Sequence, residues 1–338
     1  MKRTVSAALL CLFICAVMLV TAACTACQNP MEESSGSGGL SSMVSDFEEG
    51  RSDMMSDVES SLESFLTPED ESSALESDLN ESSLLPESSE EAAPTGAVLD
   101  ISALDLSGLD ALENEKKGWG QGVQVDELNR PIGSVVYQKD YGQYEAYYIV
   151  PTEEKVMYLT FDEGYENGYT AKILDTLKEK DCQAVFFVTL PYVKQNPELV
   201  QRMIDEGHVV GNHSVKHLSM PTLSTEAAAD EIIGLHNYML EEFGYKMTLF
   251  RPPMGEWSTR TLELAKRLGY KTVFWSYAYK DYDTENQMGV DKAFPKVSAA
   301  AHPGALYLLH AVSKDNTEML GDLIDHFRAE GYSLELFQ

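Results

Sequence analysis

Cysteine is nearly absent from most of this 338-residue chain. Four of its five cysteines, Cys11, Cys15, Cys24 and Cys27, lie within the first 27 residues, and Cys182 alone occurs later. A single thiol cannot form an internal disulfide, and a thiolate metal site needs several cysteines. The sequence therefore excludes a disulfide-stapled fold and a thiolate metal site from the rest of the chain.

Positive charge is also scarce. The chain has 25 Lys and Arg against 55 Asp and Glu, which gives a formal net charge of −30. Residues 31–100 hold 19 acidic residues and a single basic one, Arg51, so much of the excess lies in one segment. Proteins that bind nucleic acid neutralise phosphates with clustered Lys and Arg, and the sequence has no such cluster. We therefore expect no nucleic-acid partner.

The first residues have the pattern of an export signal. Lys2 and Arg3 precede an apolar run over 5–20, and small residues follow before Cys24. This order is typical of a secretory signal. The stretch 19–24 resembles a bacterial lipobox, which predicts lipidation at Cys24 and an extracytoplasmic protein tethered to the outer face of the cell membrane. An ordinary signal peptide or an uncleaved anchor is the alternative.

The composition changes twice after this signal. Residues 25–96 are rich in Ser and Glu, and such segments bury too little apolar surface to offset chain entropy. The predicted organisation is a signal peptide over 1–24, a disordered acidic tether over 25–96, an N-terminal extension over 97–149 and the main domain over 150–338.

The main domain alternates short apolar runs with helical patterns. The runs predict buried strands over 156–161, 184–189, 209–211, 248–250, 272–276 and 305–309. The helical patterns cover 169–180, 197–206, 225–243, 259–268 and 318–330. This alternation predicts an α/β fold with parallel strands. About 190 residues is short for an eightfold barrel, which typically needs about 250, so a smaller or distorted barrel fits better.

Polar residues follow several of these predicted strands. Asp162 and Glu163 end the first strand, where two adjacent carboxylates are costly unless they bind a cation or manage protons. His213 and His217 follow the third strand, and their spacing places both on one side of a helical turn. Two imidazoles and a carboxylate suit Zn²⁺, and Co²⁺, Ni²⁺ or Mn²⁺ stay open.

Two further strand ends add to this set. Arg251 follows the fourth strand and is suited to orient a buried carboxylate and hold it ionised. His310 ends the last strand, where it could protonate a leaving amine with Asp281 as its partner. Parallel α/β folds place their sites at the carboxyl ends of strands, so we expect these residues to meet.

The order of these motifs resembles the polysaccharide deacetylase family, carbohydrate esterase family 4. Thr160–Gly164 is similar to the family pattern T-F-D-D-G, His213–His217 to H-S/T-x-x-H and Arg251–Gly255 to R-x-P-x-G, and later motifs are matched by Asp281-Tyr282 and Leu308–His310. The resemblance implies a distorted (β/α) barrel of about seven parallel strands. It also implies metal-dependent hydrolytic removal of acetyl groups from a cell-wall glycan.

The resemblance also assigns roles to residues. It implies Asp162 as catalytic base, Arg251 as the residue that orients it, and His310 as general acid supported by Asp281. The remaining roles are metal ligation by Glu163, His213 and His217, oxyanion stabilisation by the backbone N–H of Met254, an acetyl pocket lined by Leu308, and substrate contacts by Tyr282 and Trp275.

Longer phrases over 161–169, 274–281 and 310–316 resemble the delta-lactam-biosynthetic branch. Members of that branch de-N-acetylate N-acetylmuramic acid in peptidoglycan, a step toward the muramic lactam of the spore cortex, so this is the expected substrate. The chain departs from the family at Glu163, which replaces Asp, at Tyr282, which replaces Trp, and at Met254, where the branch often has a basic residue. N-acetylglucosamine or chitin-type glycans, acetylxylan, and a catalytically impaired wall-binding lipoprotein stay open.

Overall fold

The computed structural model describes residues 98–338, which comprise the main domain and nearly all of the predicted extension. The signal peptide, the lipidation site at Cys24 and the acidic tether lie outside the described residues and stay predictions. Within the described part, none of the helices is both long enough and apolar enough to cross a membrane.

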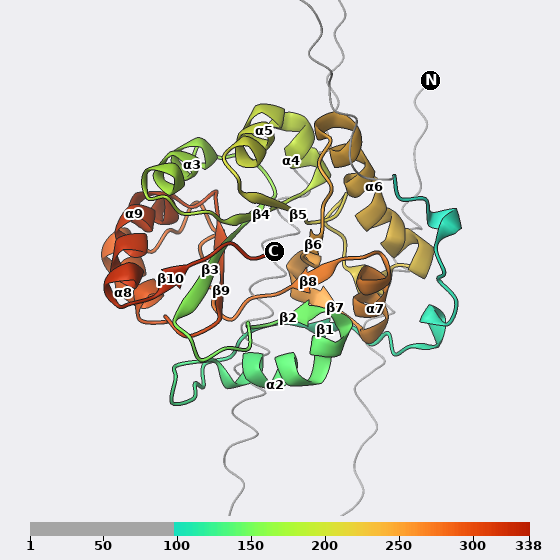
Figure 1. Cartoon of the computed structure of the whole chain (residues 1–338), viewed down its shortest axis with the longest axis horizontal. Helices are drawn as coiled ribbons and strands as arrows, with labels where there is room; N and C mark the ends of the chain where they lie inside the picture. Colours follow the sequence, from blue (N-terminus) through green and yellow to red (C-terminus); the bar gives the residue numbers. More distant parts are fainter. Residues whose placement is uncertain (1–97) are drawn as a thin grey trace, which may run out of the picture. The chain divides into compact units, whose positions relative to one another are not determined.

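A curved sheet forms the centre of the described chain (Figure 1). Its strands lie in the order β10, β3, β4, β5, β6, β8 and β2, and β9 also pairs with β3. The pairings of this sheet among the described residues are parallel. The strands are β2 (Ala146–Tyr147), β3 (Val156–Glu163), β4 (Val185–Val188), β5 (Val209–Asn212), β6 (Leu249–Phe250), β8 (Lys271–Val273), β9 (Ala305–His310) and β10 (Ser333–Leu334).

The sheet curls until the chain that follows β8 reaches β9. Tyr277 forms a parallel bridge with Tyr307 of β9. The backbone N–H of Ser276 donates to the carbonyl of Leu306 at 2.9 Å, and that of Leu308 donates to the carbonyl of Tyr277 at 2.8 Å. The prediction of an α/β fold built as a distorted barrel of about seven parallel strands is confirmed, and each strand predicted from an apolar run is present.

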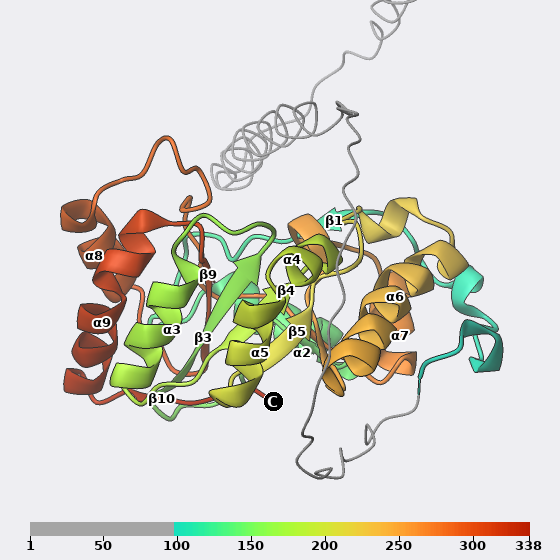
Figure 2. The same ribbon diagram turned by 90° about the horizontal axis from the view of Figure 1, so that it is seen from above.

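Helices lie on the outside of this sheet (Figure 2). Five were predicted and are confirmed with ends shifted by a few residues: α3 (Thr170–Glu179), α5 (Pro197–Asp205), α6 (Thr225–Phe243), α7 (Thr259–Arg267) and α9 (Lys314–Ala329). Ser224 and Ser313 cap α6 and α9 by accepting a hydrogen bond from a backbone N–H of the first turn. The sequence did not predict α2 (Ile132–Tyr141), α4 (Leu190–Gln195) or α8 (Val290–Ser298), which contains Pro295.

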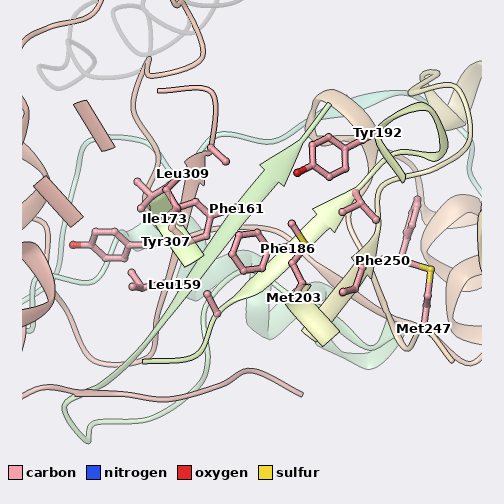
Figure 3. Packing of buried hydrophobic residues seen from close by; sticks show 14 of the residues in the cluster. Leu159, Phe161, Ile173, Phe186, Tyr192, Met203, Met247, Phe250, Tyr307 and Leu309 are labelled. Atoms are coloured by element: carbon pink, nitrogen blue, oxygen red, sulfur yellow. The ribbon is translucent and has the colours of Figure 1, made fainter. Parts of the chain in front are cut away.

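Side chains of the strands alternate between two apolar environments. Leu159 and Phe161 of β3 point toward the helices, and the Phe161 ring stacks on Phe186 of β4 with centroids 5.2 Å apart (Figure 3). Tyr158 packs against a second cluster, on the inner face of the sheet, and its ring lies 5.5 Å from that of Phe337. The buried residues of this inner cluster are Val185, Phe187, Leu249, Val273, Leu306 and Phe337. Because successive residues of a strand face opposite sides, this alternation fixes the direction of every residue in β3.

The N-terminal extension adds an aromatic cluster beside the barrel. Strand β1 (Lys117–Gly118) pairs antiparallel with β7 (Glu256–Trp257). Trp119 follows β1, and its ring lies 4.5 Å from that of Tyr148, which stacks on Phe274 at 4.3 Å. The extension therefore packs against the segment that leaves β8.

Gly304 offers a test of how closely β9 approaches the chain before β3. Its φ is +73°, and a Cβ there would lie 1.9 Å from the carbonyl oxygen of Val150. We expect Gly304→Ala to lower the free energy of unfolding by about 2–5 kcal/mol, since left-handed backbone strain adds to a backbone collision. Urea unfolding of the purified protein measures this.

Gly269 is the matched control. Its φ is +82°, and no heavy atom lies within 4 Å of a Cβ built there. Gly269→Ala should cost about 1–2 kcal/mol from backbone strain alone. Equal losses in the two variants would contradict the close packing at Gly304.

Candidate active site

The end of β3 separates the two adjacent carboxylates. Asp162 and Glu163 lie on opposite faces of the strand, as any two successive strand residues do. Asp162 pairs in register with His310 of β9, so these two residues are neighbours although 148 residues separate them in sequence. The side chain of Asp162 therefore lies on the same face of the sheet as that of His310, and the side chain of Glu163 points to the opposite face.

Arg251 lies just after β6 and is completely buried. Its Nη1 donates to Asp162 Oδ1 at 2.6 Å, its Nη2 to Thr160 Oγ1 at 2.9 Å and its Nε to the carbonyl of Val273 at 3.0 Å. The ring of Phe187 lies 4.1 Å from the centre of the guanidinium. The structure thus brings Arg251 to Asp162, as the sequence predicted, and fixes its planar fork by contacts with several strands.

The charges around Asp162 decide its ionisation. Burial alone would raise the pKa of the carboxyl, but the opposing interactions together outweigh it, chief among them the positive charge of Arg251, to which its hydrogen bond to Asp162 adds. The pKa of Asp162 consequently lies below its usual value of 3.8. Asp162 is an anion near neutral pH and can accept a proton.

His213 and His217 lie close together, and they lie on the loop after β5 and not on a helix. His213 Nε2 lies 3.1 Å from His217 Nε2 and 3.6 Å from Asp162 Oδ2. The expected helical turn over 213–217 is wrong, because Ser214 and His217 adopt left-handed φ values of 72° and 56°. The side chain of Ser214 accepts from the backbone N–H of His217 at 2.9 Å, which holds this turn.

This histidine pair fits two ligands of one metal ion. His213 Nδ1 donates to the carbonyl of Arg251 at 2.8 Å, which leaves the lone pair of Nε2 toward His217. Burial lowers the pKa of His213, and it lowers that of His217 to about 3, so both rings are neutral. Two nitrogens on a tetrahedral Zn²⁺ lie about 3.3 Å apart, close to the separation here.

A third protein ligand is not in place. Among residues 98–338, no group of three or more His, Cys, Asp or Glu is arranged to hold a metal ion. The Glu163 carboxyl is fully buried and lies 3.4 Å from Thr170 Oγ1 at the start of α3. Burial, reinforced by the charge of Glu166, raises the pKa of Glu163 well above its usual range. Ligation by Glu163 stays a prediction.

His310 and Asp281 form a second pair, in which the carboxylate is buried and 23% of the imidazole side chain is exposed. The ring Nδ1 of His310 donates to Asp281 Oδ1 at 2.7 Å, and its backbone N–H donates to Asp281 Oδ2 at 2.8 Å. Burial would lower the pKa of the imidazole, but the charge and hydrogen bond of Asp281, together with the charge of Asp162, outweigh it and raise the pKa above the usual 6.5. Since Nδ1 is occupied, Nε2 carries the proton that His310 can give away.

Two of the predicted substrate residues, Tyr282 and Leu308, lie near these pairs. Tyr282 has its ring 5.6 Å from that of His310, and Leu308 lies on β9 in register with Thr160. Met254, in the short 3-10 helix that follows β6, has a left-handed φ of 58°. Their contacts with substrate stay predictions.

Trp275 is held by residues that the sequence did not single out. Its indole N–H donates to Gln121 Oε1 at 3.0 Å, and Trp119 Nε1 donates to the carbonyl of Trp275 at 2.9 Å. Gly255 has a left-handed φ of +63°, and a Cβ there would lie 2.7 Å from the Trp275 ring, so a larger residue would strain the backbone and displace the ring. Gln121 and Trp119 belong to the extension, where no motif marked them.

Three comparisons agree with this geometry. Residues 149–273 match the family described as polysaccharide deacetylase. The chain is 41% identical over 231 residues to the peptidoglycan-N-acetylmuramic acid deacetylase PdaA of Bacillus subtilis, an alignment that covers 67% of this chain and 86% of that protein. It is 33% identical over 186 residues to a peptidoglycan-N-acetylglucosamine deacetylase of Bacillus cereus, with 54% and 86% covered.

A solved structure shows the same likeness in three dimensions. The structure of Bacillus subtilis PdaA, described as a family 4 carbohydrate esterase, aligns with a TM-score of 0.63 and 42% identity. The alignment covers 66% of this chain and 95% of that one. This chain therefore belongs to the polysaccharide deacetylase family of hydrolases, carbohydrate esterase family 4.

Proposed function

We propose that this protein is a metal-dependent N-deacetylase that removes the acetyl group of N-acetylmuramic acid in peptidoglycan and releases acetate. The observation that supports the proposal is the register pairing of Asp162 with His310, which brings a carboxylate held by Arg251 beside an imidazole held by Asp281. The choice of muramic acid is supported by the 41% identity to a deacetylase of that substrate.

Asp162 serves as the general base. As an anion beside Arg251, it takes a proton from the water that attacks the acetamide carbon. The guanidinium is bound to Thr160 and to backbone carbonyls as well, so it keeps its position when Asp162 gains the proton. The pair is thus organised before substrate arrives.

His213 and His217 would hold a divalent ion, which we propose to be Zn²⁺, with Co²⁺, Ni²⁺ or Mn²⁺ as alternatives. When bound, such an ion would supply Lewis-acid polarisation of the acetamide carbonyl. Glu163 is the proposed third ligand and would have to turn away from Thr170 to reach it.

His310 serves as the general acid. Its Nε2 gives a proton to the departing amine, whose expulsion as an anion would otherwise be prohibitive. We assign the backbone N–H of Met254 to the developing oxyanion, Leu308 to the acetyl methyl, and Tyr282 and Trp275 to the glycan. We further propose that Cys24 is lipidated and that the protein acts at the outer face of the cell membrane.

Acetate release from defined glycans tests this function. We expect release from peptide-stripped muramyl glycan, and a loss of about 10²–10⁴-fold in Asp162→Asn, because that variant cannot accept the proton. The carboxamide introduced by this substitution can still accept a hydrogen bond from Arg251 but leaves its buried charge unpaired. We therefore expect a less stable protein, and circular dichroism checks that the fold is retained at the assay temperature.

Parallel substrates separate the alternatives. Release from N-acetylglucosamine oligomers or acetylxylan, without release from muramyl glycan, would reassign the substrate. Activity that survives chelation, with no response to added Zn²⁺, would reject the metal requirement. No release from any glycan at any metal concentration would leave a wall-binding lipoprotein.

The pH profile of kcat/KM tests the two proton carriers. We expect the midpoint of the acidic limb below pH 3.8, because Arg251 contributes to lowering the pKa of Asp162. We expect the midpoint of the alkaline limb above pH 6.5, because Asp281 contributes to raising the pKa of His310. In Asp281→Asn the alkaline limb should move to lower pH, since burial then dominates at His310.

Asp283→Asn is the control for that shift. Asp283 lies in the same loop but accepts hydrogen bonds from Asn286, and we expect its removal to leave the alkaline limb in place. An unmoved limb in Asp281→Asn, or an equal shift in both variants, would contradict the assignment of His310.

A further inference from the structure

Asn316 joins the proposed acid pair from helix α9. Its side-chain Nδ2 donates to Asp281 Oδ2 at 2.6 Å and to the backbone carbonyl of His310 at 3.1 Å. Its Oδ1 accepts from the hydroxyl of Tyr279 at 2.5 Å. The residue is buried, with 1% of its surface exposed. One amide therefore contacts both members of the His310–Asp281 pair.

The orientation of this amide follows from its partners. The carboxylate of Asp281 and the carbonyl of His310 only accept, so the NH₂ group must face them. The Tyr279 hydroxyl, whose pKa burial raises, stays protonated and donates to the amide oxygen on the other side. Tyr279 thus prevents the amide from flipping, and each polar atom of the side chain has a partner.

Capping of α9 does not explain this side chain. Ser313 is the N-cap, and its hydroxyl accepts from the backbone N–H of Asn316 at 3.2 Å. Any residue at position 316 supplies that backbone N–H. The side-chain amide is directed at Asp281 and His310 instead.

The amide completes a cage around the Asp281 carboxylate. Oδ1 accepts from the His310 ring, and Oδ2 accepts from the His310 backbone and from Asn316. With its oxygens bound in this way, the carboxylate cannot rotate away from the imidazole. The remaining charged or titratable groups that act on the His310 ring are Asp162, Arg251, His213 and His217, and the Tyr282 ring lies 5.6 Å away.

We propose that Asn316 is a positioning residue for cleavage of the amide bond: it fixes the Asp281 carboxylate so that His310 presents its proton to the departing amine. The inference rests on the proposed function, in which His310 is the general acid. Asn316 acts through Asp281 and does not touch substrate. Its loss should therefore matter only when the leaving group needs a proton.

Two substrates with different leaving groups test this. In Asn316→Ala we expect kcat on the N-acetylated glycan to fall about ten- to a hundredfold with KM within about twofold. Hydrolysis of 4-nitrophenyl acetate should stay within about twofold of wild type, because nitrophenolate leaves without protonation. A fall on both substrates alike, or on neither, would overturn the proposal.

Two further variants show whether the effect passes through His310. Asn167→Ala deletes a hydrogen bond to the carbonyl of Val312, which lies between β9 and α9, and it removes no contact with Asp281. This variant should leave the ratio of amide to ester hydrolysis rates unchanged. Adding Asn316→Ala to His310→Ala should cost nothing further on the glycan, because the acid is already gone. A further loss in the double variant would show that Asn316 acts elsewhere.

A measurement without substrate separates this proposal from the function itself. The proton on His310 Nδ1, bound to Asp281, should give a downfield NMR signal in wild type and in Asn167→Ala, and it should shift upfield or broaden in Asn316→Ala. If wild type releases no acetate from any glycan, the function fails while this signal still decides the role of Asn316. An unchanged signal would reject the positioning role whatever the activity.

Discussion

The ion pair between Arg251 and Asp162 is the constraint on which the site depends. Both residues are withdrawn from water, and an unpaired charge in that position would cost several kcal/mol. The pair avoids this cost because Arg251 also binds Thr160 and the carbonyl of Val273 and lies over the Phe187 ring. The carbonyl of Arg251 in turn accepts from His213, so one residue orients both the Asp162 carboxylate and the His213 ring.

Strand alternation and register explain the rest of the arrangement. Parallel pairing aligns Asp162 with His310 and Thr160 with Leu308 at the carboxyl ends of β3 and β9. The same alternation directs Glu163 toward Thr170 and α3, where its carboxyl is buried beside Glu166. Glu163, which replaces the family's Asp, is thus a residue whose side chain points away from Asp162 and His310. The Nε2 atoms of the two histidines still lie 3.1 Å apart.

Much of this could be predicted from the sequence, because the apolar runs mark the strands and the polar residues follow their ends. Asp162, Arg251, His310 and Asp281 meet as predicted. The turn at His213–His217 could not be predicted, since left-handed φ values at Ser214 and His217 break a spacing that reads as helical. The contacts of Gln121 and Asn316 also escaped prediction, because they join segments 154 and 35 residues apart and belong to no periodic pattern.

The ionisation of Asp162 tests the central claim most directly. Its side-chain carboxyl carbon can be followed by NMR from neutral pH downward and assigned by its absence in Asp162→Asn. If the interactions led by Arg251 together outweigh burial, the carboxyl keeps its negative charge as the pH falls through 3.8, the usual pKa of Asp. Protonation at a higher pH than that would mean that burial wins, and it would contradict both the role of Arg251 and the assignment of Asp162 as a ready base.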